Sequence, residues 1–217
     1  MIKKNFYMND LNLKYLVGIN QIHIRLEISL DFLFNLIEKI QNDYKGSLVQ
    51  FFTDKYVLNQ DHIFMACYYV QKAFINKINI SNKKNIEFLL YLATKRQIKN
   101  AIEAFGIKNS DLKSGNINYS IVSNENNLNK INEEILQTLE ATEIEITLNE
   151  QSIKKFNQIK SYFEISNNQI NAVLNSYGVN EVSNELISNN LDSLFLALND
   201  LICEKMALLS LEKINVD

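Results

Sequence analysis

The stretch Glu87-Phe88-Leu89-Leu90-Tyr91-Leu92-Ala93-Thr94-Lys95-Arg96-Gln97-Ile98-Lys99-Asn100-Ala101-Ile102 decides how the middle of the chain folds. At the helical angle of about 100° per residue, the apolar residues before Thr94 gather on one side of a helix. Those from Ile98 onward gather about 110° further round the axis. One straight helix would turn half of this stripe away from the core. We therefore expect two short helices, each facing the core, that meet near Thr94 and Lys95 and end at Gly106.

The expected joint between the two helices combines a capping pattern with two cations. Thr94 and Gln97 have the spacing of a capping box, which explains Gln97 in purely structural terms. Lys95 and Arg96 then fall in the first turn of the second helix, where the helix dipole disfavours cations. A helix start with free N–H groups and two cations is suited to holding an anion. Arg96 is one of two arginines beside twenty lysines, and it is the strongest functional candidate.

Basic residues extend on both sides of this joint. Residues 81–113 contain seven cations and three anions, whereas residues 132–150 contain six glutamates and no cation. The net charge of the whole chain is −3, so there is no global attraction to nucleic acid. A local basic patch can still bind a phosphate backbone. A solvated helix face is the commoner explanation, and the residues alone leave both interpretations open.

The order of sequence patterns predicts an α+β fold. Alternating apolar and polar residues predict strands within residues 16–27, 48–58, 116–123 and 143–148. Helical spacing predicts helices after the caps Ser29 and Asn59, at residues 133–139 and 151–162, and from 192 to about 213. Residues 166–190 are polar and asparagine-rich and suggest short helices or an insertion. We expect one domain with a single small mixed sheet covered by several helices and a helical C-terminal region.

Composition suits a soluble globular protein. The chain has 217 residues, of which 47% are hydrophobic and 22% are charged. No apolar run approaches the roughly 20 residues of a membrane-spanning helix, and the first residues lack a signal-peptide cleavage site. Cys67 and Cys203 lie in apolar helical patterns, as expected for reduced thiols. We therefore expect a cytoplasmic protein that does not associate with membranes.

Residue patterns that would support catalysis or metal binding are sparse. The five glycines are dispersed, so no phosphate-binding loop is indicated. His23 and His62 are the two histidines, and neither has metal ligands at suitable spacing. His62 lies near a helix start, where a surface or capping role is usual. There is no nucleophile elbow and no Cys–His pair with an orienting acid. We expect no catalytic residue, no metal site and no cofactor.

Residues 87–106 match the pattern E-x-L-L-Y-x-A/S-x-x-R-Q-I-x-x-A-I-x-x-x-G. With this motif the chain resembles the small accessory subunit of the KEOPS (EKC) complex, the family of the PRPK-binding protein TPRKB. The resemblance extends to Val17-Gly18-Ile19-Asn20-Gln21-Ile22-His23-Ile24, to Asn59-Gln60-Asp61-His62-Ile63-Phe64-Met65-Ala66 and to Glu204-Lys205-Met206-Ala207-Leu208-Leu209. It covers about residues 16–213, which leaves 1–15 as an N-terminal extension and 166–190 as an expected insertion. The family often has glycine where Thr94 stands, so the joint here is expected to be stiffer.

The resemblance implies a non-catalytic regulatory subunit. Such a subunit binds and stimulates the kinase-like ATPase subunit of KEOPS and helps to recruit the 3′ CCA tail of tRNA for threonylcarbamoyladenosine synthesis. On this basis RNA would be contacted by Lys83, Lys84, Lys95, Arg96 and Lys99. The kinase subunit would dock on helix 192–213 through apolar anchors such as Leu201, Met206 or Leu208. The alternative is a stand-alone RNA-binding module.

Overall fold

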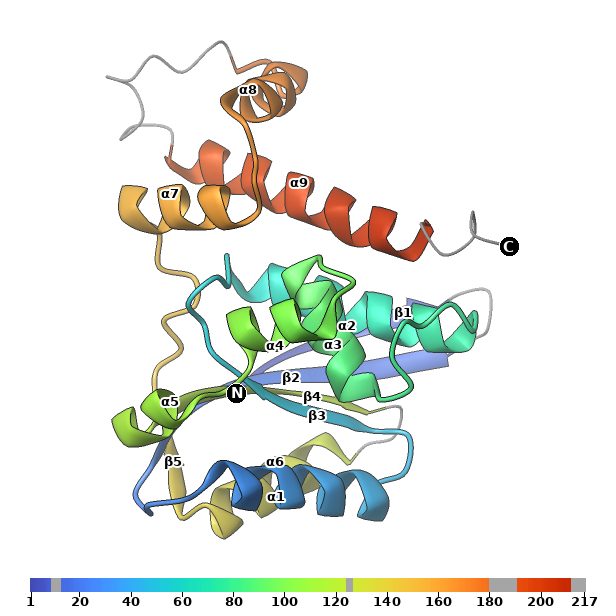
Figure 1. The fold of residues 1–217 in the computed structure, drawn as a ribbon, viewed down its shortest axis with the longest axis vertical. Helices are drawn as coiled ribbons and strands as arrows, with labels where there is room; N and C mark the ends of the chain where they lie inside the picture. Colours follow the sequence, from blue (N-terminus) through green and yellow to red (C-terminus); the bar gives the residue numbers. More distant parts are fainter. Residues whose placement is uncertain (9–12, 124–126, 180–190, 212–217) are drawn as a thin grey trace.

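One antiparallel sheet lies between two layers of helices (Figure 1). The computed structural model describes residues 1–8, 13–123, 127–179 and 191–211. Its strands are β1 (Ile2–Met8), β2 (Leu13–Ile24), β3 (Leu48–Phe52), β4 (Asn116–Ser123) and β5 (Ala141–Glu143). The order is β1-β2-β4-β3, and β5 pairs with the end of β2. Because β4 occupies one edge of β2, β1 and β5 follow each other along the opposite edge.

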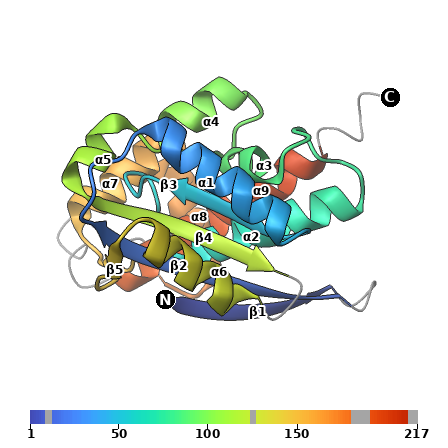
Figure 2. The same ribbon diagram turned by 90° about the horizontal axis from the view of Figure 1, so that it is seen from below.

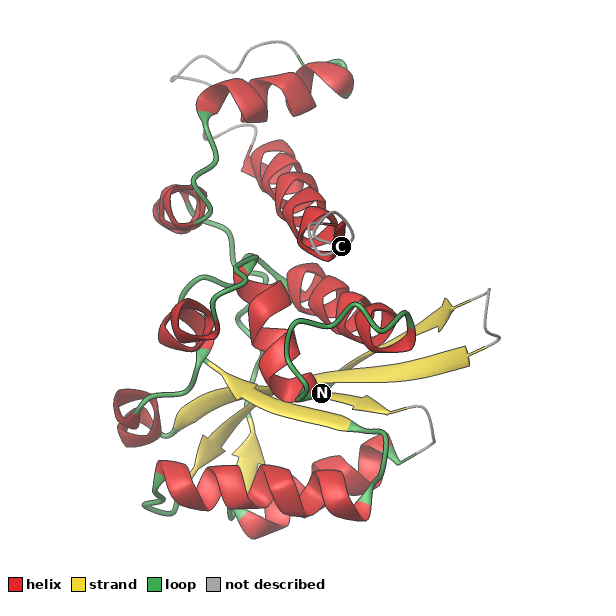
Figure 3. Ribbon diagram, turned by 45° about the vertical axis from the view of Figure 1, so that its right-hand side comes forward, coloured by secondary structure: helices red, strands yellow, loops and turns green. Residues whose placement is uncertain are grey.

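The two faces of the sheet carry unequal layers of helices. One face is covered by α1 (Leu30–Asp43) and α6 (Leu128–Thr138), with α5 (Asn109–Ser114) leading into β4 (Figure 2). The other face carries α2 (Gln60–Ile75), α3 (Lys84–Ala93) and α4 (Ile98–Phe105). An outer layer of α7 (Ile153–Tyr162), α8 (Asn167–Ser176) and α9 (Leu191–Leu211) lies beyond these helices (Figure 3).

There is a hydrophobic core on each face of the sheet, and alternating side chains of the strands contribute to both. In β2, Val17 and Ile19 are buried on the side of α2, whereas Ile22 and Ile24 are buried on the side of α1 and α6. The strand β3 divides in the same way, and all five of its residues are buried. A strand covered on both faces loses the polar positions of a half-exposed strand. The sequence Leu-Val-Gln-Phe-Phe of β3 is the local consequence.

The prediction of an α+β fold with helices covering one sheet is confirmed. Both expected helix caps are present, because Ser29 Oγ accepts from the Phe32 N–H at 3.1 Å and Asn59 Oδ1 accepts from the His62 N–H at 3.0 Å. Every described strand pairing is antiparallel, so the sheet is antiparallel rather than mixed. The first residues, expected to be an extension, include β1, which pairs with β2 from Ile2 opposite Ile19.

Several predicted boundaries were wrong for local reasons. The strand β3 ends at Phe52, where the Thr53 N–H turns to donate to the Phe105 carbonyl. The last strand occupies 141–143 rather than 143–148, because the following residues bond to the main chain and side chain of Gln21 instead of forming a ladder. The helix α6 begins at Leu128 instead of residue 133, and α5 was not predicted.

The segment expected to be an insertion is partly helical. Residues 167–176 form α8, which begins with a capping box between Ser166 and Gln169. Ile170 and Leu174 are buried and belong to the core shared with α9. The remainder of that expectation, residues 180–190, lies outside the described residues, as does the predicted end of the last helix beyond residue 211.

Candidate functional site

The joint between α3 and α4 is a left-handed helix end. Thr94 has φ 49° and ψ 36°, and its N–H bonds back to the Tyr91 carbonyl at 3.1 Å. The next N–H, from Lys95, donates to the Leu90 carbonyl at 3.1 Å. These two bonds form a Schellman motif, in which glycine is the usual left-handed residue. The predicted break at Thr94 and Lys95 is therefore confirmed, and a β-branched residue stands where glycine would be unstrained.

The predicted capping box at this joint was wrong. Thr94 closes α3 rather than opening α4, since its left-handed backbone is unlike the extended conformation of an N-cap. The N-cap of α4 is Gln97, and its side chain makes no capping bond. Instead Gln97 Oε1 accepts from the Asn100 side chain at 2.9 Å. The motif residue Gln97 thus has a different local role from the one expected.

The two helices differ in how they are buried. All residues of α3 from Glu87 to Ala93 are buried, because helices and the sheet surround it. In α4 only Ala101, Ala104 and Phe105 are buried. Ile98 and Ile102, expected to face the core, are each 43% exposed. The second half of the predicted apolar stripe therefore leaves two isoleucines on the surface.

The structure separates the basic candidates into two groups. Lys83 and Lys84 begin α3, whereas Lys95, Arg96 and Lys99 follow its end. A helix of 10 residues spans about 15 Å, so the groups lie at opposite ends of α3. Lys84 is half-buried and donates to the Gly46 carbonyl at 3.3 Å, and burial lowers the pKa of its ammonium group.

Lys95 lies at a pocket of about 390 Å³ that we call the lysine–tyrosine pocket. Its lining residues are Lys55, Tyr56, Lys95, Asn100, Glu103, Ala104, Lys108, Tyr162 and Glu164. The rings of Tyr56 and Tyr162 stack at 4.2 Å, and Lys55 Nζ lies 4.8 Å from the Tyr56 ring centroid. Lys95 is paired with Glu164 at 3.0 Å. Most of these residues cannot be recognised as one site from the sequence, because they come from separate segments.

Arg96 has a structural partner in α9. Its guanidinium donates to the Leu209 carbonyl at 3.2 Å, close to the end of that helix. A cation is favourable at a helix C-terminus because of the helix dipole. Tyr91 and Ser210 share a hydrogen bond at 2.8 Å beside it. The joint and the last turns of α9 are therefore held together by polar contacts as well as by packing.

The predicted partner-binding residues of α9 divide between core and surface. Leu201 is 6% exposed and Met206 is fully buried, since the apolar arc of α9 packs against α2, α7 and α8. Leu208 is 48% exposed. The wide apolar arc is thus mainly a core feature, and it leaves Leu196, Leu208 and Leu211 as exposed leucines.

Three side chains of types used in catalysis, those of His62, Cys67 and Glu87, are engaged in the fold. His62 is fully buried rather than at the surface; its Nε2 is 3.0 Å from the Leu92 carbonyl, and its Nδ1 accepts from the Leu58 N–H. Burial raises the pKa of the Cys67 thiol to about 12. Glu87, the first residue of the sequence motif, accepts from the Ile80 and Ser81 N–H groups and fixes the loop before α3.

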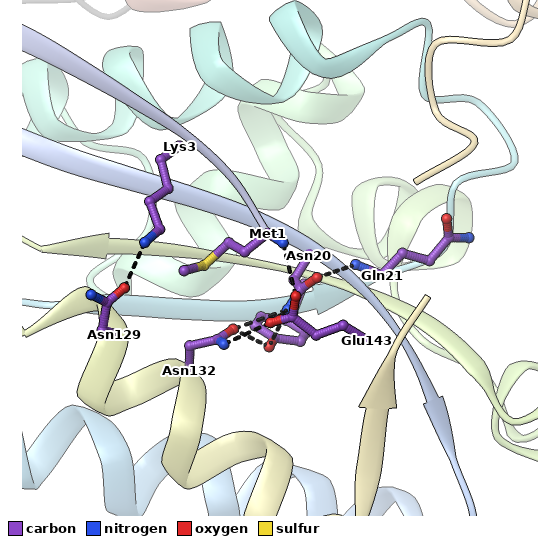
Figure 4. A network of polar contacts seen from close by, with 8 residues as sticks. Met1, Lys3, Asn20, Gln21, Asn129, Asn132 and Glu143 are labelled. Atoms are coloured by element: carbon purple, nitrogen blue, oxygen red, sulfur yellow. Dashed lines mark hydrogen bonds and ion pairs between the residues drawn. The ribbon is translucent and has the colours of Figure 1, made fainter. Parts of the chain in front are cut away.

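A polar network that is buried at Asn20, Tyr119 and Asn132 and exposed at Glu143 ties β2, β4, α6 and β5 together (Figure 4). Glu143 Oε1 accepts from the side-chain amides of Asn20 and Asn132, both at 2.9 Å. Tyr119 donates to Asn132 at 2.5 Å, and the Met1 amino group donates to Glu143 Oε2 at 3.0 Å. Burial favours the neutral form of Glu143, but these hydrogen bonds hold the pKa of its carboxyl below the usual value. The network is satisfied internally, which indicates a structural role.

The chain is therefore an α+β protein with exposed apolar residues on α4 and α9 and with pockets that contain lysines. Within the described ranges, no group of three or more His, Cys, Asp or Glu side chains is placed to hold a metal ion. None of the helices in those ranges is long and apolar enough to cross a membrane. The chain belongs to the family of the kinase binding protein CGI-121, whose family model matches residues 32–210. A comparison with curated proteins found no match.

Proposed function

We propose that this chain is a non-catalytic regulatory subunit of a KEOPS complex. It binds and stimulates the kinase-like ATPase subunit in the cytoplasm, and it helps to recruit tRNA for threonylcarbamoyladenosine synthesis. The observation that carries the proposal is membership of a kinase-binding family over residues 32–210. The presence of two free thiols, Cys67 and Cys203, fits a reducing compartment.

The kinase subunit docks on the outer face near the end of α9. Leu208 and Leu211 lie three residues apart on that face, and they are 48% and 52% exposed. Leu201 and Met206 support this face from inside the core. Leu208→Asp places a charge in the contact and is expected to weaken kinase binding by at least about tenfold. Leu26→Asp, at a leucine that is 40% exposed outside α9, is the matched control.

The test is reconstitution with the kinase-like ATPase subunit from the same genome. The two purified chains are expected to elute together in gel filtration, and the ATPase rate is expected to rise when this chain is added. Failure of the unmodified chain to associate would reject the kinase proposal. Equal loss of binding in Leu208→Asp and Leu26→Asp would reject only the α9 surface. Thermal unfolding of both variants checks that they are folded.

The 3′ CCA tail of tRNA binds at the α3–α4 joint and the lysine–tyrosine pocket. Lys55, Lys95 and Lys108 provide cations for phosphates, and Tyr56 and Tyr162 provide aromatic faces beside them. Lys99 and Arg96 flank the pocket along the chain, whereas Lys83 and Lys84 lie too far away to join it.

Charge reversal tests the RNA proposal. Lys99→Glu is expected to weaken tRNA binding by about tenfold at low salt and less at high salt. Lys130→Glu, at an exposed lysine of α6, is the control. Arg96→Glu is expected to weaken binding too, but it also disturbs the contact with Leu209, so Lys99→Glu is the cleaner test. The proposed site would be rejected if Lys99→Glu bound tRNA with unchanged affinity, or if tRNA lacking its CCA end bound as tightly as complete tRNA.

A stand-alone RNA-binding module is the second candidate function. The lysine–tyrosine pocket favours it, because the pocket needs no other protein to be complete. The two functions differ in one outcome: a stand-alone module would bind tRNA without associating with the kinase-like subunit.

A further inference from the structure

An apolar groove lies between α1 and the α3–α4 pair, on a surface that shares no residue with the α9 patch or the lysine–tyrosine pocket. Its volume is about 310 Å³. Its apolar walls are formed by Phe34, Ile37, Ile86, Leu89, Ile102 and Ile107. Gln50 of β3 also lines it. The strand β3 is an edge strand of the sheet and lies between α1 and α4 (Figure 1).

The groove exposes large apolar side chains from both walls. Phe34 of α1 is 49% exposed, and Ile102 of α4 is 43% exposed. A polar basin of about 570 Å³ adjoins the groove and shares Glu38, Lys83 and Asn85 with it. An apolar centre beside a polar rim is the arrangement of protein–protein interfaces.

The charges around the groove are unbalanced toward the positive. Lys83, whose side chain is 71% exposed, lies at one end, and Lys99, also exposed, lies one turn before Ile102 on α4. Glu38 is the acidic residue of the groove lining, and its pair with Lys83 is long, at 3.7 Å, and exposed at both ends. Such a pair contributes little and exchanges partners readily. The face therefore complements acidic residues, although the whole chain carries a net charge of −3.

We propose that this groove is a second protein-docking site, which takes an amphipathic helix of a partner with acidic residues beside its apolar face. A helix fits better than an added strand, since every residue of β3 is 5% exposed or less and the sheet edge is already covered. Apolar side chains at i, i+4 and i+7 of the bound helix contact Phe34 and Ile102. Its acidic residues replace Glu38 at Lys83 and approach Lys99.

Protein is favoured over RNA at this face for two reasons. Five of the six apolar wall residues are aliphatic and only Phe34 is aromatic, whereas single-stranded RNA stacks successive bases on aromatic faces. The Lys84 ammonium is half-buried and already bonded to the Gly46 carbonyl and to Gln71. RNA binding at the groove would therefore overturn the proposal.

The test uses a designed helical peptide of about 18 residues, with leucines at i, i+4 and i+7 and glutamates beside them. Binding of the labelled peptide to the full chain is followed by fluorescence anisotropy. The comparison peptide has lysines in place of the glutamates. Ile102→Ser and Ile98→Ser form a matched pair, since both isoleucines are 43% exposed on α4 and only Ile102 lines the groove.

The glutamate peptide is expected to bind saturably and more tightly than the lysine peptide. Ile102→Ser is expected to weaken binding by about tenfold or more, while Ile98→Ser changes it less than about twofold. Lys83→Glu is expected to reverse the preference between the two peptides. Should Ile102→Ser fail to fold, Phe34→Ser takes its place, with Phe32→Ser as its control.

Three results would overturn the proposal. The first is no saturable binding of the glutamate peptide up to about 1 mM. The second is an equal effect of the groove variant and its control. The third is loss of tRNA binding in Ile102→Ser, which would assign the face to RNA. Loss of kinase binding in Leu208→Asp alone bears on the proposed function and leaves the groove unaffected.

Discussion

Acidification should destabilise this protein through one buried histidine, His62. The imidazole lies beneath α3, with Nε2 hydrogen-bonded to the Leu92 carbonyl and Nδ1 accepting from the Leu58 N–H. This pattern requires the neutral ring with its proton on Nε2. Burial lowers the pKa of His62 from 6.5 to about 4; nearby Lys155 adds to this, and the bond to Leu92 partly offsets it. Protonation would also turn the acceptor Nδ1 into a second donor facing the Leu58 N–H.

The sign and size of the effect follow from linkage. Below pH 6.5 the unfolded chain binds a proton at His62, whereas the folded chain remains neutral there until about pH 4. The free energy of unfolding therefore decreases as the pH falls from 6.5 to about 4, by up to about 1.4 kcal/mol per pH unit. By pH 4.5 the loss from His62 reaches about 2.5 kcal/mol. Above pH 6.5 both states are neutral at this residue, and the contribution to pH dependence vanishes.

Urea unfolding at several pH values between 7.5 and 4.5 measures this loss. His62→Gln is the reference, because its amide can accept and donate in similar directions and does not titrate. The free energy of unfolding of the wild type is expected to fall by about 2.5 kcal/mol more than that of the variant. Parallel pH profiles for the two proteins, or an NMR titration of His62 with a pKa near 6.5, would contradict this prediction.

Three further predictions concern the residues that shape the joint and the core. Thr94→Gly relieves a left-handed β-branched residue and should stabilise the protein by about 1 kcal/mol in thermal unfolding; a lower Tm would contradict this. Glu87→Gln replaces a buried carboxylate that accepts from two backbone N–H groups, and should cost about 2 kcal/mol in urea unfolding; an unchanged midpoint would argue against it. Burial raises the pKa of the Cys67 thiol from 9.0 to about 12, so a Cys203→Ser variant should carry about a thousandfold less thiolate at pH 8 than an unshifted thiol. A disulfide reagent should then label Cys67 only after unfolding, and rapid labelling of the native protein would show the thiol to be accessible.

Local sequence patterns predicted the structure correctly where residues close together in the chain determine the backbone conformation. The change of direction in the apolar stripe located the break at Thr94, and the side chains of Ser29 and Asn59 marked two helix starts. These features depend on contacts within about one turn of helix, which the sequence displays directly. The same pattern did not reveal how the break is closed. A left-handed threonine and a capping-box threonine have similar neighbours in sequence, and only the backbone conformation distinguishes them.

The sequence pattern did not show which helix faces are buried in the core and which are exposed. Leu201 and Met206 were expected to meet a partner and are buried, whereas Ile98 and Ile102 were expected in the core and are exposed. Helical periodicity shows which residues share a face, but not what covers that face. The helices that determine burial come from other parts of the chain. For α9 these are α7 and α8, and for α4 it is α1, on the other side of the groove.

Short-range patterns in the amino-acid sequence identified the α+β class, most of the helices and strands, and the motif around residues 87–106. These follow from short-range periodicity, capping and turn chemistry. The strand order, the addition of β1, the division of the lysines into two groups and the position of Tyr56, Lys95 and Tyr162 at one pocket became evident from the three-dimensional packing. Strand pairing and helix packing bring together residues far apart in the chain, and the partners in these contacts are selected by shape and burial rather than by local pattern.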